Sequence, residues 1–195
     1  LSNDENGSGA TTILKQIAAE VLQIDIDEIH VVTRDTDTTP YDNYSASSRT
    51  AYTTGNAVKA AALDLITKLK DAVAHEIGVH QINIDIVGRK AIVRGYQQTE
   101  IEIARLFKPV NFFEQGNFGM MKGSPITGHG VYCPAPVLPW GEDGRSIRQW
   151  NWYQYSAGAV EGAVNEETGQ VKVLKYSSAA DTGNHHPRHF SHLAR

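Results

Sequence analysis

An alanine-rich, amphipathic stretch from Ala57 to about Ala74 constrains the fold of this chain more than any other feature. Its apolar side chains recur at helical spacing on one face, at Val58, Ala61, Ala62, Leu65 and Leu69. Five charged residues interrupt it, so it cannot span a membrane. Gly78 is expected to end it, because glycine adopts the left-handed conformation found at helix C-termini. We therefore predict a long helix that packs one face on a core.

Length and charge narrow the classes of protein that remain. A chain of 195 residues that is 41% hydrophobic suits one globular domain, or two small ones, with a real core. The net charge is −4 and no basic block occurs, which argues against nucleic acid as a partner. A single cysteine, Cys133, excludes an internal disulfide and favours a reducing compartment, so we expect a cytoplasmic protein. Cys133 itself is predicted to be a small buried apolar residue.

The other predicted elements mix helices and strands without strict alternation, which indicates an α+β fold with a mixed sheet and packed helices. The patterns predict a helix from about Thr12 to Leu22 with Thr11 or Thr12 as its N-cap, a buried strand at 29–33, a hairpin at 82–95 that turns at Gly88, a short helix opened by a Thr99–Glu102 capping box, an irregular segment at 115–148, and two strands joined at 167–169.

Two hydroxyl- or glycine-rich turns each precede a predicted helix: "NGSGATT" at 6–12 and "SASSRT" at 45–50. A helix start carries unpaired backbone N–H groups and a partial positive charge, so it attracts anions. Glycine allows a ligand to approach the backbone, and an arginine can bind phosphate with two hydrogen bonds. From the residues alone, plain helix capping remains favoured over a phosphate site at either turn.

Several motifs occur together and in order: "GSGATTILKQIAAEVLQI", "DTDTTPYD", "SASSRTAYTTGNAV", "NEETGQVKVL" and "ADTGN". With them the chain resembles the molybdopterin-binding large subunit of the xanthine oxidase and aldehyde oxidoreductase family, the molybdenum hydroxylases. The resemblance extends over about residues 5–184. It implies the second cofactor-binding region of that subunit, in which a Gly-Gln-Gly turn and an Ala-Ser-Arg-Thr-like turn hold the molybdopterin cofactor, possibly in its dinucleotide form.

Carried over to this chain, the resemblance implies cofactor-binding roles at both turns. The residues concerned are Gly7, Ser8 and Gly9 in the first turn and Ser47, Ser48, Arg49 and Thr50 in the second. Ser8 stands where the family has glutamine, so any side-chain contact there is shorter or lost. The family's catalytic glutamate would follow Arg195, and no catalytic residue or metal ligand is assigned within the chain. We therefore expect a 1–184 cofactor-binding domain fragment with a divergent, flexible tail at 185–195.

The resemblance implies an enzyme that oxidises an aldehyde or N-heterocycle with water-derived oxygen. Its expected partners are the remaining large-subunit segments, the iron–sulfur and possibly flavin subunits, and a small-molecule substrate; iron–sulfur clusters would lie only on those other parts. The isolated chain is expected to be inactive. Two alternatives stay open: a non-catalytic module of the same fold without cofactor, and an unrelated enzyme that binds a phosphate ligand.

Overall fold

The computed structural model describes residues 5–33, 35–42, 44–95, 99–107 and 125–181. The chain divides into two compact units, residues 1–134 and 135–195. Each unit is described by itself. The predicted tail at 185–195 lies outside the described residues, as does the 115–124 part of the predicted irregular segment.

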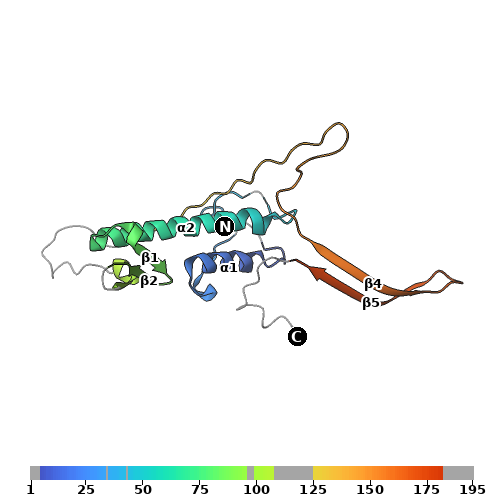
Figure 1. Ribbon diagram of the computed structural model, residues 1–195, viewed down its shortest axis with the longest axis horizontal. Helices are drawn as coiled ribbons and strands as arrows, with labels where there is room; N and C mark the ends of the chain where they lie inside the picture. The colour runs from blue at the N-terminus through green and yellow to red at the C-terminus, as the bar shows by residue number, and fades with distance from the viewer. Residues whose placement is uncertain (1–4, 34, 43, 96–98, 108–124, 182–195) are drawn as a thin grey trace. The chain divides into compact units, whose positions relative to one another are not determined.

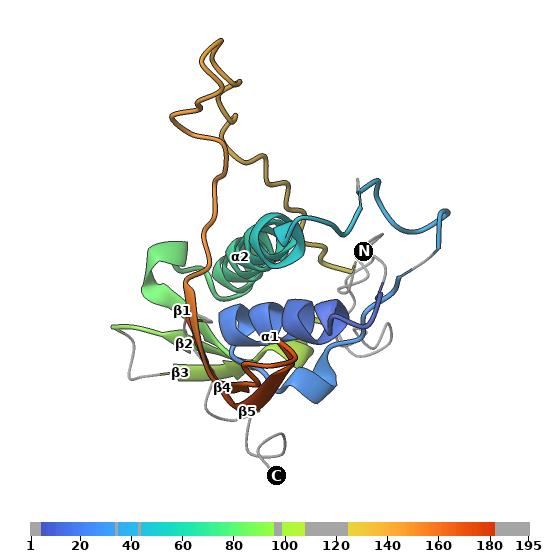
Figure 2. The same ribbon diagram turned by 90° about the vertical axis from the view of Figure 1, so that its right-hand side faces the viewer.

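Two helices dominate the first unit: α1 (Ala10–Leu22) and α2 (Arg49–Ile77). They pack side by side (Figure 2). Gly78 ends α2 in the left-handed conformation, as predicted. Helix α2 begins eight residues earlier than the apolar periodicity indicates, because its first turns are polar. The predicted threonine N-cap of α1 is wrong: Gly9 is the N-cap, and Thr11 and Thr12 lie inside the helix.

A three-stranded antiparallel sheet packs against the C-terminal half of α2. It consists of β1 (Ile84–Val87), β2 (Lys90–Val93) and β3 (Thr99–Glu102) in the order β1-β2-β3. The core between helix and sheet centres on Val73, Ile84 and Ala91, each fully buried. The predicted hairpin with its turn at Gly88 is therefore confirmed, and α2 lies over its apolar face.

Two predicted elements are wrong. Residues 29–33 form no strand and are half-buried or exposed. Among the described residues of the first unit, the sheet consists of β1, β2 and β3 and does not include them. The Thr99–Glu102 segment is strand β3, followed by a short 3₁₀ helix at Ile103–Phe107, not a capped helix. Ile101 lies opposite Ala91 in the sheet. The period-2 alternation of this segment therefore overrides its capping-box pattern.

The second unit contains a long hairpin, β4 (Ser156–Val164) and β5 (Val171–Ala180), preceded by an irregular segment at 135–155. This confirms the two strands predicted to join near 167–169; a turn there is closed by the Asn165 side chain, which accepts from the backbone N–H groups of Glu167 and Thr168. The α+β class is confirmed. Among the described residues, no helix combines the length and the apolar character that a membrane crossing requires.

Candidate functional site

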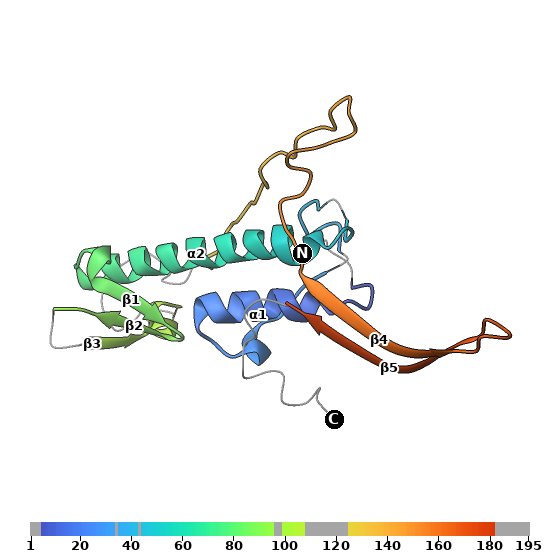
Figure 3. The same ribbon diagram turned by 45° about the vertical axis from the view of Figure 1, so that its right-hand side comes forward.

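The two predicted turns lie at the same end of the helix pair. Helices α1 and α2 run in the same direction, so both begin at one end (Figures 1 and 3). Gly55 sets their spacing: a Cβ added there would lie 2.7 Å from Cδ1 of Ile17. Ile17 lies seven positions after the start of α1, and Gly55 lies six positions after the start of α2. The two helix starts therefore lie at about the same height along the helix axes.

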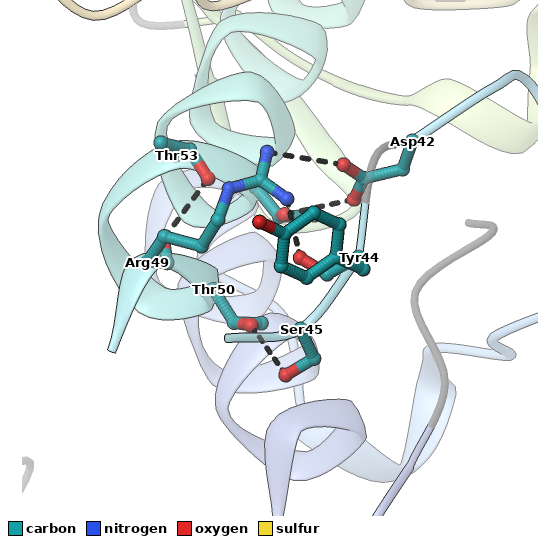
Figure 4. Close-up of polar contacts among 7 residues, drawn as sticks. Asp42, Tyr44, Ser45, Arg49, Thr50 and Thr53 are labelled. Atoms are coloured by element: carbon teal, nitrogen blue, oxygen red, sulfur yellow. Dashed lines mark hydrogen bonds and ion pairs between the residues drawn. The ribbon is translucent and has the colours of Figure 1, made fainter. Parts of the chain in front are cut away.

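At the start of α2, Arg49 is held by an internal network (Figure 4). Its Nη2 donates to Oδ1 of Asp42 at 3.2 Å, and its Nη1 donates to the carbonyl of Tyr44. The other oxygen of Asp42 accepts from the buried hydroxyl of Thr54 at 3.1 Å. The side chains of Arg49 and Asp42 are only 22% and 19% exposed. The carboxylate thus compensates the cation that the positive end of the helix dipole disfavours.

The turn just before α2 has an unusual backbone. Ser47 and Ser48 have φ values of 52° and 57°, and the N–H of Arg49 donates to the carbonyl of Ala46 at 3.0 Å. Positive φ at both central residues is the signature of a type I′ turn, which Asn-Gly normally occupies. The Ser48 side chain makes no cap hydrogen bond to the helix. The hydroxyl predicted to cap or to bind an anion therefore does not cap.

The other hydroxyls near this turn serve the protein itself. Oγ of Ser45 and Oγ1 of Thr50 lie 2.9 Å apart within hydrogen-bonding distance, and the Thr53 hydroxyl donates to the carbonyl of Arg49 at 2.9 Å (Figure 4). These two contacts thus hold the loop and the first turn of α2 together.

The turn before α1 surrounds a carboxylate of the chain. Oε1 of Glu5 accepts from the N–H groups of Gly7 and Gly9, both at 2.9 Å, and its Oε2 accepts from the N–H of Thr11 at 3.1 Å. Gly7 and Gly9 have φ values of 92° and 73°, which aim their N–H groups inward. The hydrogen bonds from Thr11 and then Gly9 lower the pKa of the Glu5 carboxyl. The first turn is thus an anion site that Glu5 fills.

An open cavity of about 710 Å³ lies beside the Arg49 network. The loop at 37–42, one face of α2 and the segment 128–132 line it, and Gly7–Gly9 do not. The 128–132 segment lies directly on α2: a Cβ on Gly130 would come within 2.2 Å of the Ala61 nitrogen and 2.3 Å of the Ala57 oxygen. The small residues of α2 therefore admit this segment.

Polar contacts fix the same segment. Asp64 on α2 accepts from the backbone N–H of His129 at 2.8 Å and from Nζ of Lys68 at 2.7 Å. Tyr132 donates to the hydroxyl of Tyr52 at 2.9 Å, with the rings edge to face at 5.6 Å, and this hydrogen bond raises the pKa of Tyr132. The next residue, Cys133, is exposed, so its predicted burial is wrong.

The two turns differ in how well they fit a phosphate-bearing cofactor. At the second turn, the Ser48 hydroxyl, which makes no cap hydrogen bond, and the guanidinium of Arg49 fit an anion, which would share that guanidinium with Asp42. At the first turn a phosphate would have to compete with Glu5 for the same N–H groups. The residue assignments at both turns stay predictions.

Sequence reasoning missed two residues that organise these turns, Glu5 and Asp42. Glu5 has a local signal, because a carboxylate two residues before a Gly-x-Gly turn can fold back onto its N–H groups. Asp42 has none: it lies seven residues before Arg49, and only the fold of the intervening loop brings the two together.

An α+β unit in which two helices begin at one end, one of them with an arginine in its first turn, is compatible with a domain that binds an anion or a phosphate-bearing cofactor. Comparison with known proteins specifies it further. The model of the molybdopterin cofactor-binding domain matches residues 1–186. The chain therefore belongs to this family, and the resemblance to the large subunits of the xanthine dehydrogenase type is confirmed.

Individual relatives agree. The chain is 26% identical over 177 residues, 91% of its length, to a probable hypoxanthine oxidase, XdhD, of Escherichia coli strain K12. It is 32% identical over 179 residues to the gamma subunit of the 6-hydroxypseudooxynicotine dehydrogenase complex of Paenarthrobacter nicotinovorans, again over 91% of its length. It spans 16% of the first of these relatives and 20% of the second.

Solved structures show the same fold. The Cu,Mo-CO dehydrogenase matches with a TM-score of 0.68 at 21% identity, over 92% of this chain and 20% of that one. Quinoline 2-oxidoreductase from Pseudomonas putida 86 matches with a TM-score of 0.63 at 16% identity, over 91% of this chain and 20% of that one. The predicted α+β, cofactor-binding-domain-like architecture is therefore confirmed.

Proposed function

We propose that this chain holds the phosphate-bearing end of molybdopterin at the start of α2, as one part of a molybdenum hydroxylase. The family match over residues 1–186 carries this proposal. The geometry supports it, because the Ser48 hydroxyl is not used as a cap and the Asp42 pair holds Arg49 at the helix start.

In this function the chain's residues bind and orient. Backbone N–H groups in the first turn of α2, the Ser48 hydroxyl and the guanidinium of Arg49 would hold the phosphate. Ser47 and Thr50 would complete this turn, in which the Thr50 hydroxyl already pairs with Ser45. Gly7, Ser8 and Gly9 would contact the cofactor through groups other than the backbone N–H groups of Gly7 and Gly9, because those donate to Glu5. When bound, the cofactor supplies oxygen-transfer and redox chemistry, which the protein serves by placement and electrostatics.

The substrate class and the partners belong to the same proposal. The proposed substrate is an aldehyde or an N-heterocycle. The names of two relatives, a probable hypoxanthine oxidase and a 6-hydroxypseudooxynicotine dehydrogenase subunit, support an oxidation of this kind. Remaining large-subunit segments, iron–sulfur and flavin subunits are the expected partners, since one relative is a subunit of a complex. A cytoplasmic location remains part of this proposal.

The test uses the complete molybdenum-binding subunit that contains this sequence, purified with its partner subunits. Molybdenum and pterin per protomer are measured for wild type, Arg49→Ala and Arg89→Ala. Arg89 is the control because it forms an ion pair with Glu28 while its side chain is 73% exposed. We expect Arg49→Ala to lower both contents about tenfold, since a charge-assisted phosphate contact is lost, and Arg89→Ala to leave them unchanged.

Two results would contradict the proposal. Wild-type cofactor content in Arg49→Ala would show that the start of α2 does not hold the cofactor phosphate through Arg49. A wild-type complex without molybdenum or pterin would favour the alternative, a non-catalytic module of the same fold, for which Ser8 in place of glutamine is the supporting observation.

A further inference from the structure

The β4–β5 hairpin exposes an apolar face that the proposed function does not use. Every residue of both strands, which Figure 3 shows paired as a long hairpin, is exposed. A hairpin of two strands alone is at best marginally stable in water. The hairpin therefore needs a surface that covers it.

The strand register separates the two faces. Val160 lies opposite Tyr176, and Val164 opposite Val171, so these side chains share one face. Val173, opposite Gly162, joins them. The hydroxyl of Tyr176 would lie 3.2 Å from a Cβ on Gly158, which shows that its ring lies along the same face. We call this set the valine face: Val160, Val164, Val171, Val173 and Tyr176, each 61–66% exposed.

The opposite face is polar. Glu161 lies opposite Lys175, and Ala163 opposite Lys172, with alanines and a serine along the rest. The register shifts between Glu161 and Gly162, because β5 has one extra residue there. After the shift, Val173 and Val171 lie on the same face as Tyr176. Apolar residues on one face and charges on the other are what a sheet shows when one side is packed and one faces water.

We propose that the valine face is a docking surface for the remainder of the molybdenum-binding large subunit, which would bury it against an apolar surface. This inference rests on the proposed function. The family model extends over residues 1–186 and so includes the hairpin, while the chain spans only 16–20% of the length of full relatives. In those relatives, the polypeptide outside the matched part is thus several times longer than this chain.

A second copy of the chain is a weaker occupant. A stable interface between free proteins uses roughly 20–30 residues on each side, and the valine face offers five side chains. Within one subunit those five side chains suffice. The two surfaces belong to one polypeptide, so their contact does not cost the translational freedom that two separate proteins lose on association.

Adjacent residues of β4 provide a matched pair of variants. Val160→Asp places a carboxylate on the valine face, and Ala159→Asp places one on the polar face, in the same strand and in an exposed position. Each is made in the complete subunit with its partners. The yield of assembled complex is measured by size-exclusion chromatography, and hydrogen exchange is measured for the β4 and β5 amides.

We expect Val160→Asp to lower the yield of assembled complex about tenfold, because burying an unpaired carboxylate is strongly unfavourable. Ala159→Asp should assemble like wild type. In the wild-type complex, β4–β5 amides should exchange much more slowly than in the 195-residue chain alone, whose circular dichroism Val160→Asp should leave unchanged.

Equal assembly of the two variants would overturn the inference. So would a concentration-dependent dimer of the chain alone that Val160→Asp abolishes, since the occupant would then be a second copy. Unfolding of the chain alone by Val160→Asp would likewise overturn it, because the face would then be covered within the chain. These results are independent of molybdenum content, so a cofactor-free complex that still shows the assembly difference would refute only the proposed function.

Discussion

The guanidinium of Arg49 and the carboxylate of Asp42 lie 3.2 Å apart at the first turn of α2, where a cation alone would oppose the helix dipole. Asp42 also accepts from the hydroxyl of Thr54, which is 8% exposed. One carboxylate thus fixes both the proposed phosphate-binding arginine and the loop that borders the cavity. The arginine is positioned before any ligand arrives, which reduces the conformational entropy that binding would otherwise lose.

The first prediction concerns this pair. We expect Asp42→Ala to lower the free energy of unfolding by about 1–3 kcal/mol, because it leaves the partly buried Arg49 without its counter-charge and the Thr54 hydroxyl without its acceptor. Arg49→Ala should have a smaller effect, since it also removes a cation from the helix start, worth about 0.3–1 kcal/mol. Urea unfolding of both single variants and the double variant gives the coupling energy. Strictly additive effects would show that the pair contributes nothing.

The second prediction concerns pH. The folded state lowers the pKa of Glu5, so its carboxylate stabilises the fold above its unfolded pKa of about 4.3. That contribution is lost as the pH falls from this value through the lowered, folded pKa. Glu5→Gln should therefore unfold more easily than wild type near pH 7, and the difference should shrink steadily below about pH 4.3.

Thermal unfolding of both proteins across this range measures the effect. Glu166→Gln, at an exposed glutamate in the turn between β4 and β5, is the control and should leave the acid limb as in wild type. An unchanged acid limb in Glu5→Gln would mean that the carboxylate is not held by the turn in solution.

Local periodicity allowed the helices and both hairpins to be predicted, because each pattern is satisfied by neighbours close in sequence. It failed where a segment carries two signals or lacks a partner. Thr99 to Glu102 fits a capping box and a period-2 strand equally, and only the pairing with β2 decides between them. The apolar run at 29–33 has strand composition, but an apolar run forms a strand only beside another strand.

The candidate site shows the same division. The "SASSRT" turn could be located because hydroxyls and an arginine before a helix are a local pattern. The left-handed backbone of Ser47 and Ser48 could not be predicted, since serine has no preference for positive φ. The Asp42 contact and the 128–132 segment on α2 depend on long-range packing.

The third prediction concerns that segment. Gly130→Ala would place a methyl group against the backbone of Ala57 and Ala61, which cannot rotate away. We expect the free energy of unfolding to fall by about 1–3 kcal/mol or the segment to leave the helix. Gly162→Ala is the control, because its Cβ would meet its nearest atom at an ordinary 3.4 Å. Unfolding curves, with hydrogen exchange at the His129 amide, distinguish the two effects. A Gly130→Ala protein indistinguishable from wild type in both measurements would show that the segment does not lie on α2.

The last prediction separates stability from function at Ser48. This residue has φ 57° and ψ 23°, and its hydroxyl makes no cap hydrogen bond. Glycine adopts the left-handed conformation without strain, so Ser48→Gly should raise the free energy of unfolding of the chain by about 0.5–1 kcal/mol. Ser48→Ala keeps the strained backbone and should not raise it. If the hydroxyl binds the cofactor phosphate, both variants should lower the pterin content of the complete enzyme, although one of them is the more stable protein. Wild-type pterin content in both would show that the left-handed serine has no role in binding, whereas a Ser48→Gly protein less stable than wild type would show that the turn is not strained.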